Sequence, residues 1–480
     1  MSDRPILVLF YRDLRIGDHP ALTAAVKANR PVVPLYVFDA RSPGNWAPGG
    51  ASRWWLHHAL QQLDTELKDL GNRLVIRDGN IVETALTVAD EVAADSIYFT
   101  RGYEPWWRTV ETSLDQRGQD MGLAVKRFGG RLLLEPEEVT TKTGDPYKVY
   151  TPFWRSVSGR RLRQPVGPIT SLKRPGRFKI KSLKVADLDL RPTAPNWARG
   201  FEPIWQPGRV GARAALESFV AERIAGYHEA RDRPDISGTS RLSPHLHFGE
   251  ISPAECWAAA SAASAGLPNV GVETFLKEVV WREFSYHLLF HWPDLPEAPF
   301  RDQFAAFPWR DDDAALRAWQ RGATGYPIVD AGMRELWETG WMHNRVRMIV
   351  ASFLTKNLLL PWQAGEAWFW DCLVDADLAS NAASWQWVAG SGADAAPYFR
   401  IFNPVKQGQT YDPDGSYVRR WVPELAKLAS RHIHAPWEAP EAALQSADVR
   451  LGETYPKPIV DHKHTRDRAL SAYATIKSQG

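Results

Sequence analysis

The 480-residue sequence contains only two cysteines, Cys256 and Cys372, which are too few for a disulfide framework or a four-cysteine zinc site. It has no run of about 18 or more apolar residues, and the apolar run near its N-terminus is too short for a secretory signal. We therefore expect a cytoplasmic protein with no targeting segment and no membrane partner.

A charge excess of either sign is also missing. The 58 basic and 56 acidic residues leave a net charge of +2, so the whole surface predicts neither nucleic acid nor membrane as a partner. Any basic binding face must be local. The two glycine-rich phosphate signatures, G-x-G-x-x-G after the first strand and G-x-x-x-x-G-K-[ST] anywhere, are absent as well. If a dinucleotide binds, another segment must hold its phosphates.

Tryptophan, in contrast, is abundant: the chain has 22 tryptophans against 14 tyrosines and 19 phenylalanines. Filling an ordinary core does not require this ranking. Eleven of the tryptophans lie between residues 275 and 390, about a quarter of the chain. Such clustering suits either a large aromatic core or a route for electron hopping.

Short β-branched and aromatic runs alternate with amphipathic stretches over residues 1–135. Strands are predicted over residues 6–10, 32–38, 73–76 and 96–100, and a helix over residues 52–70. This pattern predicts an α/β domain with an open, mostly parallel sheet.

Residues 136–207 are predicted to form an interdomain linker. Between residues 155 and 186 there are ten basic residues, no acidic residue and three prolines. We expect an extended connector on an acidic surface rather than a direct DNA contact. Helical periodicity then predicts an all-α domain over residues 208–480, whose final 45 residues are expected to be only partly ordered.

Three segments of the helical region carry groups that could bind a ligand. Residues 238–244 place three hydroxyls and an arginine at an expected helix start, which suits a pyrophosphate, although for this motif alone simple N-capping is the favoured explanation. Asp375 and Asp377 could serve acid-base chemistry or a metal, or be acidic residues at a helix start. His245 and His247 lack further ligands at metal spacing, so no metal site is predicted.

Two predicted helices present mixed faces. Over residues 272–289, Glu278 and Trp281 share a face on which a carboxylate and an indole could hold a nucleobase, or which could be a solvated surface. In the helix near residue 340, Asn344, Arg347 and Met348 share a face that could meet a planar ligand, although methionine more often fills cores.

Taken together, the motifs resemble the photolyase/cryptochrome family along the whole chain. They lie at residues 11–15 (YRDLR), 238–243 (GTSRLS), 281–284 (WREF), 324–330 (TGYPIVD), 340–348 and 381–404. The resemblance, closest to bacterial photolyases, implies an α/β antenna domain, a linker and a helical FAD domain. It also implies splitting of cyclobutane pyrimidine dimers in DNA under blue light, with an electron passing from reduced FAD to the dimer and back.

The resemblance also assigns cofactor residues by position. Those implied to line FAD are Tyr227, Thr239, Ser240, Arg241, Leu242, Ser243, Phe275, Arg347, Asp375, Ala376, Asp377 and Asn381. Arg347 is expected to pair with Asp375. Asn381 matches the residue that faces flavin N5, where asparagine is the photolyase type and aspartate is typical of plant cryptochromes. A neutral amide can bond the N5–H of reduced flavin without titrating.

Substrate and electron-transfer roles are carried over in the same way. Catalytic roles fall on Glu278, Asn344, Met348 and Asn381. DNA and dimer contacts fall on Arg231, Glu278, Trp281, Arg282, Asn344, Arg345, Met348, Trp387 and Gln407. Trp309, Trp362 and Trp385 match the three-tryptophan chain that re-reduces flavin under light. Relatives that repair (6-4) photoproducts have histidines at the places of Asn344 and Met348, so the resemblance favours the cyclobutane dimer.

The antenna site matches least. Folate-binding relatives carry an Asn-Glu pair after the Tyr-Glu that matches Tyr103 and Glu104, whereas this chain has Pro105, Trp106 and Trp107. A folate in another arrangement, a deazaflavin, a second flavin and an empty pocket all stay open.

Two other functions are possible for this fold and flavin. One is a cryptochrome-type photoreceptor, and the other is a light-independent flavin redox enzyme. Asn381 and the dimer-contact residues argue against the first, and the substrate residues beside the flavin argue against the second. We expect a monomer whose partner is damaged DNA.

Overall fold

The structure is a computed structural model that describes residues 4–176, 180–264, 268–395 and 399–477. The chain divides into two compact units. Unit 1 comprises Met1–Ala225, Ser240–Pro293 and Val374–Ala379, and unit 2 comprises Gly226–Thr239, Asp294–Leu373 and Ser380–Gly480. These units do not follow the boundaries after residues 135 and 207, which stay predictions of the sequence.

Unit 1 contains a five-stranded sheet in the order β3-β2-β1-β4-β5. Every pairing is parallel. The strands are β1 (Ile6–Phe10), β2 (Val32–Phe38), β3 (Val75–Asp78), β4 (Ser96–Thr100) and β5 (Ala124–Phe128). All residues of β1, β2 and β4 are buried, which explains their continuous apolar runs. The predicted open parallel sheet is confirmed.

Two details of the sheet differ from the sequence prediction. Strand β3 begins two residues later than expected. Strand β5 was missed because it is an edge strand whose residues are exposed or only half-buried, so it carries little apolar signal.

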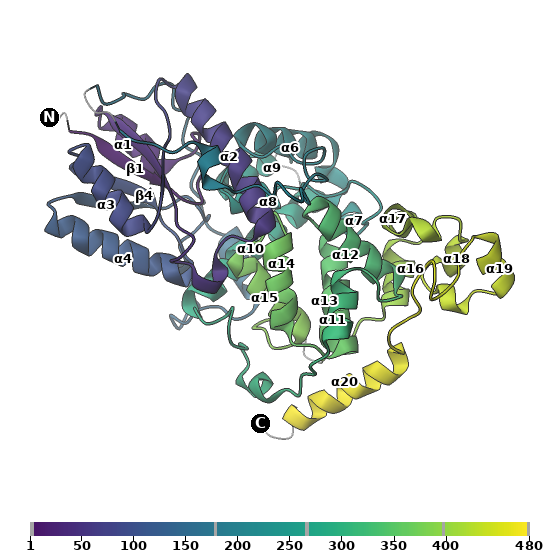
Figure 1. The fold of residues 1–480 in the computed structure, drawn as a ribbon. Helices are drawn as coiled ribbons and strands as arrows, with labels where there is room; N and C mark the ends of the chain where they lie inside the picture. Colours follow the sequence, from purple (N-terminus) through teal and green to yellow (C-terminus); the bar gives the residue numbers. More distant parts are fainter. Residues whose placement is uncertain (1–3, 177–179, 265–267, 396–398, 478–480) are drawn as a thin grey trace. The chain divides into compact units, whose positions relative to one another are not determined.

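Helices cover the sheet along its length. Helix α1 (Pro20–Lys27) packs against β1 and β4, whereas α3 (Ile81–Glu91) and α4 (Pro105–Asp120) pack on each other and on β2, β3 and β5 (Figure 1). The other helices of unit 1 are α2 (Gly50–Asp69), α5 (Tyr150–Ser158), α6 (Arg209–Glu222), α8 (Ser243–His247), α9 (Pro253–Ala263) and α10 (Val270–His291).

The basic segment follows the edge strand β3. Leu183 N donates to the Ile76 carbonyl at 2.9 Å, and Ile76 N donates to Ser182 Oγ at 2.9 Å. Arg163 pairs with buried Asp18 at 2.6 Å. Because an edge strand leaves polar groups unpaired, the segment closes the sheet on this side. An extended course was expected here, and Arg177 and Lys179 lie outside the described residues.

The described part of unit 2 is helical, as expected for the second half of the chain. Its helices are α7 (Tyr227–Ala230), α11 (Asp313–Gln320), α12 (Pro327–Thr339), α13 (Asn344–Ser352), α14 (Trp362–Cys372), α15 (Leu378–Ala389, which starts in unit 1), α16 (Pro404–Tyr411), α17 (Ser416–Trp421), α18 (Ser430–Ile433), α19 (Glu441–Ser446) and α20 (His462–Lys477). The expectation of a partly ordered C-terminal segment was wrong as far as Lys477. Ala469 and Ile476 of α20 are buried in a cluster with Phe304 and Phe399.

The turn after α8 lies directly against the segment that follows β1. Gly249 has φ +67°, and a Cβ there would lie 2.0 Å from the Arg12 carbonyl oxygen. Leu14 N donates to the Phe248 carbonyl at 3.1 Å, and Arg15 Nη1 donates to the Gly249 carbonyl at 2.8 Å. Only glycine allows this approach.

Gly249→Ala is therefore expected to lower the free energy of unfolding by about 3 kcal/mol. Roughly 1–2 kcal/mol comes from the left-handed backbone and a similar amount from displacing Arg12. Urea unfolding followed by tryptophan fluorescence measures the loss. Gly122→Ala is the control, since Gly122 has φ +71° but open space around its Cβ, and only about 1 kcal/mol should be lost there. Equal losses in the two variants would contradict the packing argument.

Candidate functional site

The hydroxyl-rich segment predicted to hold phosphates meets a carboxylate within unit 1. Ser243, the first residue of α8, donates from Oγ to Asp375 Oδ2 at 2.6 Å. Leu242 N lies 3.4 Å from Ser240 Oγ, and the Arg241 guanidinium lies 5.6 Å from the Trp205 ring centroid. The structure thus brings Ser243 together with Asp375, although they are far apart in sequence.

Asp377 is a buried carboxylate next to this group, one residue beyond buried Ala376. It accepts hydrogen bonds from the Tyr286 hydroxyl and, at 3.5 Å, from His247 Nδ1. Burial alone would raise its pKa, but His247 and then the charge of Arg282 hold the pKa well below its usual range. Asp377 is therefore an ionised acceptor beside the predicted cofactor residues.

Helix α10 carries the predicted aromatic residues of unit 1. Phe275 is buried and packs on Phe219 with a centroid distance of 4.8 Å. Trp281 stacks on Tyr150, with centroids 3.6 Å apart and planes 6° apart. Glu278 is half-buried one turn before Trp281. Tyr150 therefore fixes the plane of an indole that could stack on a base.

Arg282 is held by groups of unit 1. Its side chain is 12% exposed, and Nη1 donates to the Arg131 carbonyl at 3.0 Å and to Glu283 at 3.3 Å. Its guanidinium lies over the Tyr286 ring at 4.7 Å. The DNA contact predicted for Arg282 stays a prediction, because its guanidinium is engaged within unit 1.

In unit 2, helix α13 carries three predicted substrate residues, Asn344, Arg345 and Met348. Asn344 is exposed, and Arg345 Nη1 lies 3.9 Å from Met348 Sδ. Arg345 also donates to Asp232 at 2.9 Å and lies over the Tyr411 ring at 4.4 Å. These contacts orient Arg345 on the first turn of the helix.

The remaining predicted residues of unit 2 lie on other elements. Buried Tyr227 starts α7, and the Arg231 guanidinium lies 5.9 Å from its ring centroid. Thr239 is half-buried in the loop that follows α7, and Gln407 is half-buried on α16. Arg347 donates to the Met342 carbonyl at 2.7 Å. Because Arg347 and Asp375 belong to different units, their pairing stays a prediction.

Asn381 is buried on α15, and its amide has a fixed orientation. Nδ2 donates to the Glu366 carbonyl at 3.1 Å, so Oδ1 is the acceptor end of the amide. The N5–H group of a reduced flavin is a hydrogen-bond donor, so it needs an acceptor such as Oδ1. The Glu366 side chain, which the sequence analysis missed, is also buried, and burial followed by the charge of Glu297 raises its pKa well above its usual value.

The predicted electron-transfer residues lie among other aromatic rings. Trp385 is buried, and its centroid lies 5.0 Å from that of Phe369 and 6.2 Å from that of Trp319. Trp362 is buried, and half-buried Trp309 lies 4.4 Å from Phe307. Trp319 was missed, because spacing in sequence does not reveal ring contacts between helices.

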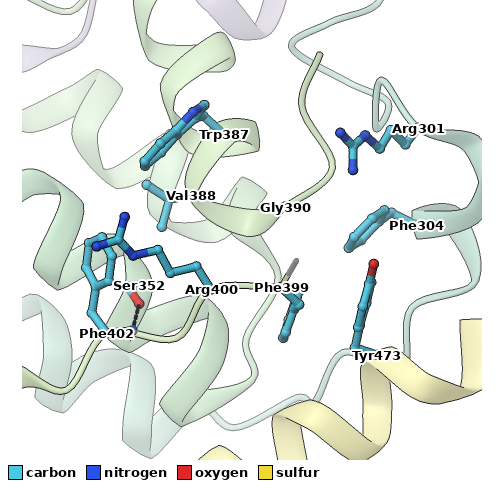
Figure 2. A pocket seen from close by; sticks show the side chains of 10 residues that line it. All are labelled: Arg301, Phe304, Ser352, Trp387, Val388, Gly390, Phe399, Arg400, Phe402 and Tyr473. Carbon is cyan, nitrogen blue, oxygen red and sulfur yellow. Dashed lines mark hydrogen bonds between the residues drawn. The ribbon is translucent and has the colours of Figure 1, made fainter. Parts of the chain in front are cut away.

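Trp387 lines a pocket of unit 2. Figure 2 shows Trp387 and Arg400 on one side and Arg301 and Phe304 on the other. The lining residues are Arg301, Phe304, Ser352, Trp387, Val388, Gly390, Phe399, Arg400, Phe402 and Tyr473. Two arginines and five aromatic rings among the described lining residues suit an anionic, planar ligand such as a nucleotide.

A second pocket, in unit 1, lies at the carboxyl ends of β1 and β2, where ligands of open parallel sheets bind. Its lining residues are Tyr11, Arg12, Tyr36, Val37, Phe38, Asp39, Pro43, Trp46, Pro48, Leu56, Ile81, Trp106 and Phe248. We call it the N-terminal pocket. The sequence analysis expected an antenna site near Trp106 but did not name the other residues that line this pocket. Trp107 stacks on Tyr11 at 4.0 Å and Trp106 meets Tyr11 edge-on at 5.3 Å.

Tyr103 and Glu104, which match the folate contacts of relatives, are engaged in internal bonds. The Tyr103 hydroxyl donates to Glu135 at 2.8 Å, and Glu104 forms a bidentate pair with Arg131 at 3.0 and 3.1 Å. Both residues are buried. This geometry agrees with the poor match of the antenna motif.

His245 pairs with Glu250 and His247 with Arg12. No cluster of metal-ligand type occurs among the described residues. Within the same residues, none of the helices is long and apolar enough to cross a membrane.

The chain is similar to known proteins over its whole length. Residues 6–170 match the family model of DNA photolyase, and residues 275–475 match that of the FAD binding domain of DNA photolyase. A deoxyribodipyrimidine photo-lyase of Agrobacterium fabrum is 52% identical over 99% of each chain. Cryptochrome-1 of Arabidopsis thaliana is 40% identical over 98% of this chain and 70% of its own. The crystal structure of a class III photolyase from Agrobacterium tumefaciens superposes with a TM-score of 0.96 and 51% identity, covering 100% of this chain and 98% of that one.

Ser243→Ala is expected to weaken FAD binding about tenfold, because Asp375 loses a short hydrogen bond to its carboxylate. The dissociation constant, measured by flavin fluorescence after dilution of the purified holoprotein, reports the change. Ser264→Ala is the control, since Ser264 lies in unit 1 and its exposed Oγ donates to the Ser261 carbonyl at 2.8 Å. Unaltered FAD binding in Ser243→Ala would contradict a role for this contact.

Proposed function

The chain belongs to the photolyase/cryptochrome family, and from this premise we propose that it is a deoxyribodipyrimidine photo-lyase that repairs cyclobutane pyrimidine dimers in DNA under blue light. The observation that carries the proposal is the 52% identity, over 99% of both chains, to a relative of that name. The chain has the FAD binding domain of the family. Reduced FAD, when bound, supplies one electron on excitation and takes it back, so the reaction has no net redox change.

Asn381 supports repair over signalling. Its amide is neutral at every pH, and the Glu366 carbonyl holds Nδ2 so that Oδ1 is left as the acceptor for a flavin N5–H. An ionisable carboxylate at this position would exchange a proton with its surroundings, which is the cryptochrome pattern that the sequence resemblance implies. The amide keeps the hydrogen-bonding pattern constant.

The proposed substrate is the cyclobutane dimer. Asn344 and Met348 stand where relatives that repair (6-4) photoproducts have histidines, so this chain lacks an acid at those places. Stacking of Trp281 on Tyr150 supports an apolar wall for a flipped dimer, with Glu278 as the acceptor for its N–H groups.

Local basic groups support DNA binding despite the near-neutral net charge. In unit 2, Arg301 and Arg400 line the pocket that contains Trp387, and Arg231 and Arg345 lie on or beside short helices. Phosphate contacts of this kind supply most of the affinity for DNA, and base contacts add the selection.

We propose further that the N-terminal pocket holds a second, light-harvesting chromophore. It is lined by five aromatic rings besides Trp106, and the Arg12 guanidinium offers a charged donor. A planar chromophore with an anionic or carbonyl group fits this lining. Extraction of the bound molecule and determination of its mass would distinguish a folate, a deazaflavin and a flavin.

The protein is proposed to act as a single chain in the cytoplasm. Cys256 and Cys372 are both free and buried, in agreement with a reducing compartment.

Repair of an oligonucleotide with one thymine dimer tests the proposed function. The reduced protein should restore the dimer to thymines under blue light, do nothing in the dark, and leave a (6-4) substrate unrepaired. Bound flavin without repair of either lesion would favour the photoreceptor. Flavin oxidation by a soluble substrate in the dark would favour the redox enzyme.

Trp281→Ala is expected to reduce the preference for damaged over undamaged DNA by about tenfold, because one base-stacking contact contributes roughly 1–3 kcal/mol. Binding competition between the two oligonucleotides measures the preference. Trp337→Ala is the matched control: Trp337 is 50% exposed and stacks on Trp368 at 6.0 Å. An unchanged preference in Trp281→Ala would count against the stacking role.

Trp309→Phe is expected to suppress photoreduction of oxidised flavin at least tenfold while repair by the pre-reduced protein stays within twofold. Phenylalanine keeps the packing on Phe307 but is much harder to oxidise than an indole. Illumination of the oxidised protein with an external reductant measures the first rate, and the dimer assay measures the second. Loss of both activities would overturn the electron-transfer assignment.

A further inference from the structure

A chain of buried polar contacts in unit 1 connects the N-terminal pocket with Asp377. Arg12 lines the pocket and is only 8% exposed. Its Nη1 contacts Nε2 of His247, a residue of α8. His247 Nδ1 lies 3.5 Å from Asp377 Oδ2. One imidazole therefore stands between a wall residue of the pocket and a carboxylate predicted to line FAD.

Arg12 determines which nitrogen of His247 carries the proton. A guanidinium can only donate, so Nε2 of His247 must be the acceptor. Burial, followed by the charge of Arg12, lowers the pKa of His247 to about 4, so the ring is neutral at neutral pH. The single proton of a neutral ring is then on Nδ1, which faces Asp377. The Arg12 contact thereby leaves Nδ1–H of His247 as the donor of the hydrogen bond that Asp377 accepts.

A second set of contacts joins the same two places. The Tyr286 hydroxyl donates to Asp377 and lies 3.1 Å from Arg131 Nη2. The Arg131 guanidinium lies over the ring of Tyr11, another wall residue of the pocket, at 5.6 Å. Both routes are buried, which keeps their electrostatic interactions strong.

The backbone limits how far Arg12 can move away from α8. Gly249 lies against the Arg12 carbonyl, and Leu14 N is bonded to the Phe248 carbonyl. When the Arg12 side chain changes, the segment after β1 and the end of α8 cannot move apart to compensate. The change must be transmitted to His247.

We propose that Arg12 is a positioning residue for Asp377, acting through the tautomer of His247, and that the N-terminal pocket and the flavin site are thereby energetically coupled. The inference rests on the proposed function, because the cofactor role of Asp377 is part of it. A pocket ligand that accepts from the other N–H groups of Arg12 holds the side chain in the conformation that His247 needs. Occupation of the pocket then strengthens FAD binding, and by reciprocity FAD strengthens binding in the pocket.

The test measures the FAD dissociation constant of purified holoprotein variants by flavin fluorescence. Arg12→Met removes the donor and is expected to weaken FAD binding about tenfold, within the range of typical couplings. Arg12→Lys restores one donor and should recover most of the loss. His247→Phe should weaken binding similarly, and Arg12→Met combined with it should cause no further loss, because both act through one route.

Arg101→Met is the matched control. Arg101 follows β4 as Arg12 follows β1 and is equally buried, but it pairs with Glu135 and Glu137 instead of His247. It should reduce stability without altering FAD affinity. A merely structural role of Arg12 would make the two methionine variants behave alike.

Wild-type FAD affinity in Arg12→Met, no recovery by lysine, or additive losses in the double variant would each overturn the proposal. If His247→Phe does not fold, the comparison of methionine with lysine at position 12 still decides. A wild-type protein that binds FAD but repairs no dimer would instead overturn the proposed function and leave the coupling measurable.

Discussion

The structure of unit 1 depends on how two buried guanidinium groups are satisfied. Arg15 is 1% exposed and donates to the carbonyls of Asp18, Gly130 and Gly249. Arg12 contacts His247. Leaving such a charge buried without partners costs on the order of several kcal/mol. The segment after β1, the turn at Gly130 and the end of α8 must therefore meet, which explains why residues 240–293 join the sheet in one unit. The contacts among these three segments also form part of the N-terminal pocket and fix the surroundings of Asp377.

The proposed chemistry needs two different polar environments. In unit 1, Asp377 is kept charged by His247 and Arg282. In unit 2, Asn381 is a neutral amide oriented by the Glu366 carbonyl. A fixed charge suits the binding of a ligand, whereas an amide that does not titrate suits a cofactor that must return to its starting state. Neither group has to change protonation for an electron to leave and come back.

Much of the fold was predictable because its signals are local. Strands β1, β2 and β4 are buried on both faces, and helix α10 carries a clear apolar stripe. The apolar pattern of these segments was therefore sufficient to predict them. Strand β5 and helix α20 were missed, since an exposed edge strand and a helix buried through alanines carry little apolar pattern. Within the site, residues 238–244 and Asp375 were candidates because of their polar groups, whereas the role of Asn381 could be assigned only through motifs of the family. Contacts between distant segments, such as Trp281 on Tyr150 or Trp385 near Trp319, leave no trace in sequence spacing, and the N-terminal pocket forms from many such segments.

The central claim is that light moves one electron from reduced flavin to a dimer and back. Transient absorption of the reduced protein with a dimer-containing oligonucleotide tests it most directly. The account predicts that the dimer shortens the lifetime of the excited flavin and that the reduced flavin spectrum returns fully as thymines form. An excited-state lifetime unaffected by the dimer, or flavin left oxidised after each turnover, would contradict the account.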